Sequence, residues 1–412
     1  MLERKNQREN KQRKNRIVMK QPIKKKEFKR PSIASFKEKY GLTVKSDKDL
    51  VKSVADKPMN FIPLPEAFSD AIKLPGIPMG YLTIVTGWSN TGKSTIKNCL
   101  IASCINNGIL PVIYETENNF DFKYEIDCGM KATPIYGDVE VEDVDMETGE
   151  ITTHTENRIV NYDGEFMYFD SKILAARYGN IDYANGGKEL KTYRKQAVLE
   201  DIAYSINDIL DAQDRGEIQQ PICFIWDSIG SITSLKSVNS KVGNNQFDAG
   251  AISQAFSEII NSRIPSSKKI SEPYTNTFFC INKIWNDAMN SMGGVPSIEL
   301  KGGKTFFYGA RLIIHLGGIG KASIKKLTAT AKGETYNYGI TTKIRTTKNQ
   351  LPTPWNITYE GEMSCVHNGL INPNKLDDYK KTYMKEILNR LEEGGVQVNE
   401  DEVEFTEEDT NE

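Results

Sequence analysis

Short apolar runs alternate with longer helical patterns along most of this 412-residue chain. Four runs of consecutive apolar or β-branched residues are predicted to be buried strands, at 81–86, 111–114, 222–226 and 275–281. Helical patterns lie between them, for example at 96–105 and 201–214. Strands that alternate with helices predict an α/β fold, in which helices cover both faces of a mostly parallel central sheet.

The same pattern divides the chain into a core and several additions. We expect the core to run from 61 to 350. Alternating residues between about 133 and 163 predict a β-hairpin inserted into it. Residues 31–60 form a Lys-rich, helical lead-in, which is either a docking segment for an adjacent subunit or a helix packed on its own core. Residues 351–390 predict a small C-terminal region that ends in a helix.

Charge is distributed unevenly, although the net charge is only −2. Residues 1–30 carry thirteen lysines and arginines against three acids, which predicts a disordered basic arm. Residues 391–412 carry acids and no basic residue, which predicts an acidic disordered tail. No apolar run is long enough to cross a bilayer, and the six cysteines lack the spacing of a zinc site. We therefore expect a cytoplasmic protein with reduced, buried thiols.

A glycine-containing loop follows the first predicted strand and precedes a predicted helix. Gly87-Trp88-Ser89-Asn90-Thr91-Gly92-Lys93-Ser94-Thr95 matches the phosphate-binding pattern G-x-x-x-x-G-K-[ST] at every fixed position. Lys93 is suited to reach the β- and γ-phosphates of ATP, and the Ser94 hydroxyl is suited to ligate Mg²⁺. The loop residues predicted to bind ATP are Gly87, Ser89, Asn90, Thr91, Gly92, Lys93, Ser94 and Thr95.

Carboxylates follow two of the later strands. Glu117 comes after the strand at 111–114, where it is suited to orient and deprotonate an attacking water. Asp227 comes directly after the strand at 222–226, where it is suited to hold the Mg²⁺ shell. Taken singly, Glu117 also fits a solvated loop acid and Asp227 also fits a helix N-cap. Their order at successive strand ends favours the catalytic interpretation.

Two long loops suit the backbone of single-stranded DNA, because they combine amides, hydroxyls, glycines and a few cations. They lie at 231–250 and 285–303. The residues predicted to contact DNA are Lys236, Lys241, Met292, Gly293, Gly294, Lys301, Gly302 and Gly303. The alternative is that both are surface loops without a ligand, although loops this long inside a compact core are usually functional.

With these motifs in place, the chain resembles the RecA-type strand-exchange recombinases, and among them the bacteriophage UvsX group, over roughly residues 61–362. Beyond the loop and the two acids, the resemblance rests on Asp121 and Tyr124, Cys280–Ile284, Gly302–Lys304 and Lys343–Gln350. It implies a RecA-like P-loop ATPase core. In that family a tyrosine matching Tyr124 stacks on adenine, and a lysine matching Lys348 reaches the γ-phosphate of a neighbouring subunit. Two positions depart from the family pattern, since Lys283 and Gln350 stand where glutamine and lysine are common.

The resemblance implies a DNA-dependent ATPase that forms helical filaments on single-stranded DNA. Such a protein pairs and exchanges homologous strands in DNA recombination and repair. Single-stranded and duplex DNA and further copies of the chain are then its partners, and a recombination mediator and a single-stranded-DNA-binding protein are further candidates. Two alternatives stay open, a RecA-fold hexameric DNA helicase or motor ATPase and a non-catalytic ATP-binding regulator. A ring helicase normally has an arginine finger and a separate domain, and a regulator is expected to lose Glu117 or Lys93.

Overall fold

The chain divides into two units, Met1–Val51 and Lys52–Glu412, and every residue described below belongs to the second. The structure, a computed structural model, describes residues 55–144, 149, 151–183, 188, 189, 191, 193–240, 245–286, 298–300, 303–318, 322–394 and 397–410. The predicted basic arm (1–30) and most of the predicted docking segment (31–60) lie outside these residues.

Within the described residues, six parallel strands form the centre of the main sheet, in the order β13-β3-β11-β10-β4-β7. They are β3 (Leu82–Gly87), β4 (Leu110–Glu115), β7 (Met167–Asp170), β10 (Ile222–Ile229), β11 (Thr277–Asn286) and β13 (Ala310–Leu316). β3, β4, β10 and β11 coincide with the four predicted strands. The prediction of an α/β fold with a mostly parallel central sheet is confirmed.

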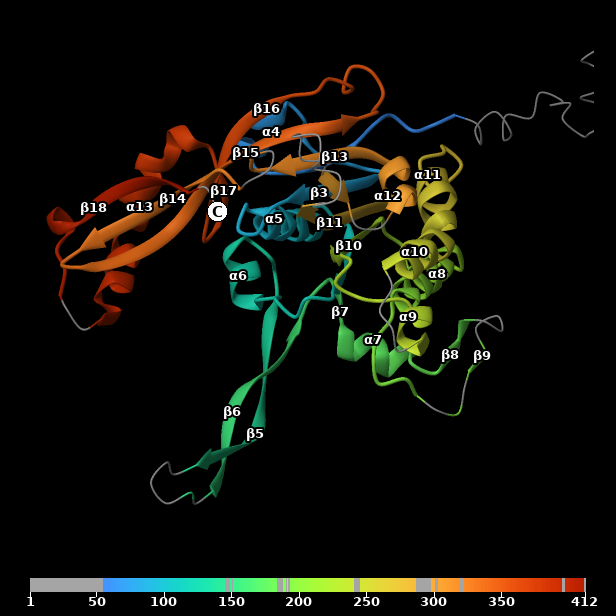
Figure 1. Ribbon diagram of the computed structural model, residues 1–412, viewed down its shortest axis with the longest axis horizontal. Coiled ribbons are helices and arrows are strands. Elements are labelled where there is room, and N and C mark those ends of the chain that lie inside the picture. Colours follow the sequence, from blue (N-terminus) through green and yellow to red (C-terminus); the bar gives the residue numbers. More distant parts are fainter. Residues whose placement is uncertain are drawn as a thin grey trace, which may run out of the picture. The chain divides into compact units, whose positions relative to one another are not determined.

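Side chains of the central strands alternate between two apolar layers, because successive residues of a strand point to opposite faces. On β10, Phe224 and Trp226 face the layer that contains α7 (Ser171–Tyr178), α8 (Leu199–Asp214), α10 (Asn245–Glu258) and α12 (Gly303–Gly309). Cys223 and Ile225 face the layer that contains α4 (Glu66–Ile72) and α5 (Lys93–Asn106). Helices thus cover both faces, as predicted, with α8 and α10 on one side of β10 and α5 on the other (Figure 1).

An antiparallel extension continues the sheet beyond β13. The long strand β15 (Glu334–Asn349) pairs with β13, β14 (Ile324–Ala331) and β16 (Glu360–Val366), and β17 (Gly369–Ile371) pairs with β16. The region 351–390, expected to be a separate appendage, therefore supplies two strands of the main sheet before the helix α13 (Leu376–Leu391). The physical reason is that backbone N–H and C=O groups along one edge of β15 would be unpaired without β16, and pairing with β16 satisfies them.

The acidic end of the chain, expected from its charge to be disordered from 391, is ordered over the described residues 397–410. It forms η6 (Glu400–Glu402) and β18 (Glu404–Thr410), and β18 pairs antiparallel with β14. Asp409 and Glu408 lie opposite Lys325 and Lys326 in this pairing. Phe405 packs with Val398 and Val403 in a small apolar cluster under β14 and β15. The acidic composition alone predicts that the loss of chain entropy keeps this segment disordered. The paired opposite charges and the apolar cluster offset that loss.

The inserted hairpin is confirmed. It consists of β5 (Thr133–Val144) and β6 (Ile151–Asp163), paired along their length, and it extends away from the main sheet (Figure 1). Its base is held by aromatic packing, since Tyr162 stacks on Phe122 of α6 (Phe122–Asp127) with ring centroids 4.3 Å apart.

Short elements complete the described part of the chain. They are β1 (Phe61–Pro63), β2 (Gly76–Pro78), β8 (Ile181–Asp182), β9 (Lys188–Glu189), α9 (Leu235–Ser240), η2 (Ile259–Arg263), α11 (Ile264–Ser266), β12 (Ile298–Leu300), η4 (Pro373–Lys375) and η5 (Glu392–Gly394). Among the helices described, none combines the length and the apolar composition that crossing a membrane requires.

Replacing Phe405 by alanine should loosen β18 and destabilise the protein. The Phe405 ring meets Tyr338 edge-on, with centroids 5.8 Å apart, and Lys380 lies over its face. Because the ring is only partly buried, we expect a loss of about 2 kcal/mol in the free energy of unfolding. Chemical denaturation measures this loss, and amide hydrogen exchange in β14 should become faster. Glu407→Ala, at an exposed position of the same strand, is the control, and equal losses from the two variants would contradict the role of Phe405.

Candidate functional site

The loop between β3 and α5 has the geometry of an anion cradle. Trp88 O accepts hydrogen bonds from Thr91 Oγ1 (2.8 Å) and from Lys93 Nζ. α5 begins at Lys93, and its N-cap, Gly92, has a φ of 90°. A left-handed backbone favours glycine, and a Cβ at this position would clash with Cys365 Sγ. Gly92 is therefore required both by the backbone conformation and by the space around it.

The first turn of α5 is suited to receive negative charge. It contains no acidic residue, and no side chain caps its N-terminus. The first N–H groups of a helix have no partner within the helix, and the helix dipole adds positive potential there. Ser89, Asn90 and Ser94 are exposed around this end. A glycine cradle, free backbone donors and hydroxyl groups are the donor set that fits a phosphate group.

A cavity of about 420 Å³ adjoins this loop. Residues 90–95 line one side of it, and Tyr124, residues 336–340 of β15 and residues 365–367 line the other. Tyr124 thus lies beside the loop, where its hydroxyl is 2.9 Å from Thr95 Oγ1. No local pattern in the sequence indicated the β15 and β16 residues, because only the pairing of distant strands brings them to the loop.

Glu117 lies at the carboxyl edge of the parallel strands, and both of its oxygens are engaged. Ser228 Oγ donates to Oε1, and Lys283 Nζ lies 2.7 Å from Oε2. Lys283 is on β11 and pairs in register with Gly87 of β3. The predicted base therefore lies next to the loop, as the sequence indicated, but a lysine covers one of its oxygens.

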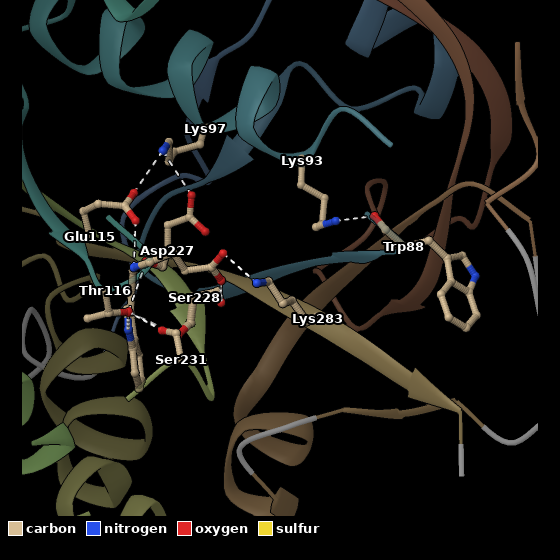
Figure 2. Close-up of polar contacts among 11 residues, drawn as sticks. Trp88, Lys93, Lys97, Glu115, Thr116, Asp227, Ser228, Ser231 and Lys283 are labelled. Carbon is tan, nitrogen blue, oxygen red and sulfur yellow. Dashed lines mark hydrogen bonds and ion pairs between the residues drawn. The ribbon is translucent and has the colours of Figure 1, made fainter. Parts of the chain in front are cut away.

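Asp227 is held from within the protein by a lysine that the motifs did not reveal. Lys97 Nζ lies 3.0 Å from Asp227 Oδ2, 3.4 Å from Glu115 Oε2 and 3.7 Å from Glu125 Oε1. The Lys97 side chain is 3% exposed, and those of Glu115 and Glu125 are 0% and 1% exposed. We call Lys97, Glu115, Glu125 and Asp227 the buried charge cluster. Figure 2 shows Lys97 between Glu115 and Asp227.

The charges in this cluster compensate one another. Burial alone would lower the pKa of Lys97, but the carboxylates of Asp227, Glu125 and Glu115 raise it above its usual value. Burial raises the pKa of Glu115, and it raises the pKa of Glu125 to about 8. The Asn98 amide, with its NH₂ toward them, donates to Glu125 Oε1 and to Ser94 O, both at 2.7 Å. The Lys97 ammonium opposes the rise in the pKa of Glu125 that burial causes.

Lys348, predicted to act across a subunit boundary, contacts α12 in its own chain. Its Nζ donates to Phe307 O (2.6 Å) and Tyr308 O (3.2 Å). Of the predicted DNA-contacting residues, Lys236 lies in α9 and Gly303 begins α12. The others, Lys241, Met292, Gly293, Gly294, Lys301 and Gly302, lie outside the described residues. The structure thus brings together the loop, Tyr124, Glu117 and Asp227.

Comparison with known families finds no family model that matches this chain. No curated protein matches it either.

The stability of the protein should depend on pH through Lys93. Burial lowers the pKa of Lys93 to about 8, although Asp227 and Glu117 raise it in part. Between pH 8 and the ordinary lysine pKa of about 10.5 the unfolded chain then binds more protons, so the free energy of unfolding rises with pH. Relative to Lys93→Met, the wild type should gain about 1–2 kcal/mol between pH 7 and pH 10, because part of the side chain stays exposed. Urea denaturation of both proteins across this range checks the slope, and a pH-independent difference would contradict it.

Proposed function

We propose that this chain is an ATP-dependent DNA recombinase with a RecA-like core, which forms filaments on single-stranded DNA and exchanges homologous strands. The observation that supports it best is the shared edge of the parallel sheet. The phosphate-type loop, the uncapped start of α5, Glu117 and Asp227 all lie there. This combination supplies an anion site, a metal-binding carboxylate and a base for one phosphoryl transfer to water.

In the proposed reaction Lys93 exchanges its contact with Trp88 O for the phosphates of ATP. Ser94 and Asp227 are the residues that would hold Mg²⁺, since a hydroxyl and a carboxylate are oxygen ligands of the kind this ion prefers. Bound Mg²⁺ would neutralise charge on the phosphates during transfer. Lys97 occupies Oδ2 of Asp227, which leaves Oδ1 for the metal shell. The cavity beside Tyr124 would receive the base and ribose.

Glu117 would take the proton of the attacking water. Its ion pair with Lys283 occupies one oxygen of the carboxylate. Lys283 is followed along the chain by the loop at 285–303, which the sequence predicts to contact DNA. Binding of DNA to that stretch would draw Lys283 away and free the base. The Lys283–Glu117 pair therefore supports a DNA-dependent rather than a constitutive ATPase.

Lys348 would act on the ATP of a neighbouring subunit. In the isolated chain it caps carbonyls at the end of α12, beside the exposed aromatic side chains of Phe307 (43%) and Tyr308 (66%). Exposed aromatic rings next to a cation are typical of surfaces that contact another protein. A contact that places one subunit's lysine at the next subunit's ATP is heterologous, and a heterologous contact that does not close gives a helical filament.

Glu117→Gln should separate binding from hydrolysis. The amide keeps the shape of the side chain but cannot accept the proton of water, so hydrolysis stimulated by single-stranded DNA should fall by about 10²-fold or more. ATP and DNA binding should persist, and electron microscopy should show filaments that outlast those of the wild type. Lys93→Ala is the control that should lose nucleotide binding and filaments together. Wild-type rates in Glu117→Gln would exclude its role as base, and closed rings in the wild type would favour a hexameric helicase.

Mixing two inactive variants should test the position of Lys348. Lys348→Ala should still bind ATP as a monomer but lose DNA-stimulated hydrolysis, since a cation supplied across a boundary is worth about 10³-fold or more in rate. Lys93→Ala retains Lys348 but has no working loop. In a mixture, some boundaries pair an intact loop with an intact Lys348, and partial activity should return. Absence of any rescue, together with weaker ATP binding by Lys348→Ala alone, would place Lys348 in its own subunit's site.

A further inference from the structure

The buried charge cluster joins the helix that carries the loop to both predicted functional carboxylates. Lys97 lies four residues after Lys93 on α5, hence on the same face of the helix and one turn further in. Its contacts reach the ends of two strands, Asp227 on β10 and Glu115 on β4, which pair in register. One side chain therefore links three elements that start or end at the site.

Glu115 extends this link to the predicted base. While Oε2 faces Lys97, Oε1 accepts the backbone N–H of Glu117 at 2.9 Å. The intervening residue, Thr116, donates its N–H to Asp227 O at 2.8 Å. The backbone that carries Glu117 is thus fixed both to Lys97, through Glu115, and to the strand of Asp227. A displacement of Lys97 would move both functional carboxylates relative to the loop.

We propose that Lys97 is a positioning residue, which sets the places of Asp227 and Glu117 relative to the phosphate loop and so sets the Mg²⁺ requirement of the site. The inference rests on the proposed function.

Lys97 also contributes to stability, because it supplies the positive charge among the carboxylates of the buried charge cluster. Removing the lysine alone would leave buried carboxylates without a compensating charge, which is strongly destabilising. An apolar residue could not hold acceptor groups in fixed positions, as the three N–H donors of one ammonium group do.

Lys97→Met tests the inference, with affinity for a fluorescent ATP analogue measured in EDTA and over a Mg²⁺ series, and with ATP hydrolysis on single-stranded DNA. We expect affinity in EDTA within about threefold of wild type, since Lys93 and the loop are untouched. The Mg²⁺ concentration for half-maximal effect should rise about 10- to 100-fold, as for other residues that orient a metal ligand. The turnover number should fall about 10²-fold, and excess Mg²⁺ should restore only part of it.

Arg194→Met is the matched control. Arg194 forms another largely buried ion pair, at 2.7 Å from Asp201 Oδ1, on the α8 side of the sheet. If both variants lower the melting temperature but only Lys97→Met changes the Mg²⁺ dependence, positioning is supported. Parallel effects, or an unchanged Mg²⁺ dependence in Lys97→Met, would overturn it.

A second variant covers failure of Lys97→Met to fold. Lys97→Met/Glu115→Gln removes one charge of each sign and leaves an amide oxygen for the Glu117 N–H, and it should show the same rise in Mg²⁺ requirement. A normal requirement in a folded double variant would overturn the inference. The proposed function fails separately, if the wild type neither binds nor hydrolyses ATP.

Discussion

The register of the parallel strands is the constraint from which the site follows. β4 and β10 pair so that Glu115 lies beside Asp227, and β11 and β3 pair so that Lys283 lies beside Gly87. A slip of one residue in either pair would turn every side chain of that strand to the opposite face. Because both apolar layers would then lose their strand residues, the hydrophobic core itself holds the polar groups in place.

Two lysines of α5 have their pKa values shifted in opposite directions by their surroundings. Lys97 is fully enclosed, and three acidic neighbours raise its pKa above the usual value. Lys93, one turn earlier, has its pKa lowered by burial, and among the described residues its Nζ hydrogen-bonds to a carbonyl oxygen of the loop rather than to a carboxylate. Its charge is therefore poorly compensated until an anion arrives. In the proposed function, binding of a phosphate would relieve that cost, and part of the affinity would come from a charge that folding left unsatisfied.

The sequence was sufficient for features that local patterns encode. Continuous apolar runs predicted the central strands, and the glycine spacing predicted the loop before Lys93. The sequence did not indicate the role of Lys97, because a lysine on an otherwise apolar helix is usually solvated. Its partners Glu115 and Glu125 belong to other elements. The ordered acidic strand β18 was missed for a related reason. Composition indicated disorder, whereas pairing with β14 and the packing of Phe405 depend on a strand far earlier in the chain.

The length of β15 has a consequence for any assembly of this chain. The strand lines the cavity beside the loop at Tyr338 and Gly339 and carries Lys348 near its other end. An extended strand advances about 3.3 Å per residue, so these two points are separated by about 30 Å of continuous, hydrogen-bonded backbone. In the proposed filament this strand would act as a rigid spacer from one ATP to the next. Inserting or deleting a residue between Gly339 and Lys348 would shift the pairing of β15 with β13 or β16, so the sheet itself fixes the distance between these two points.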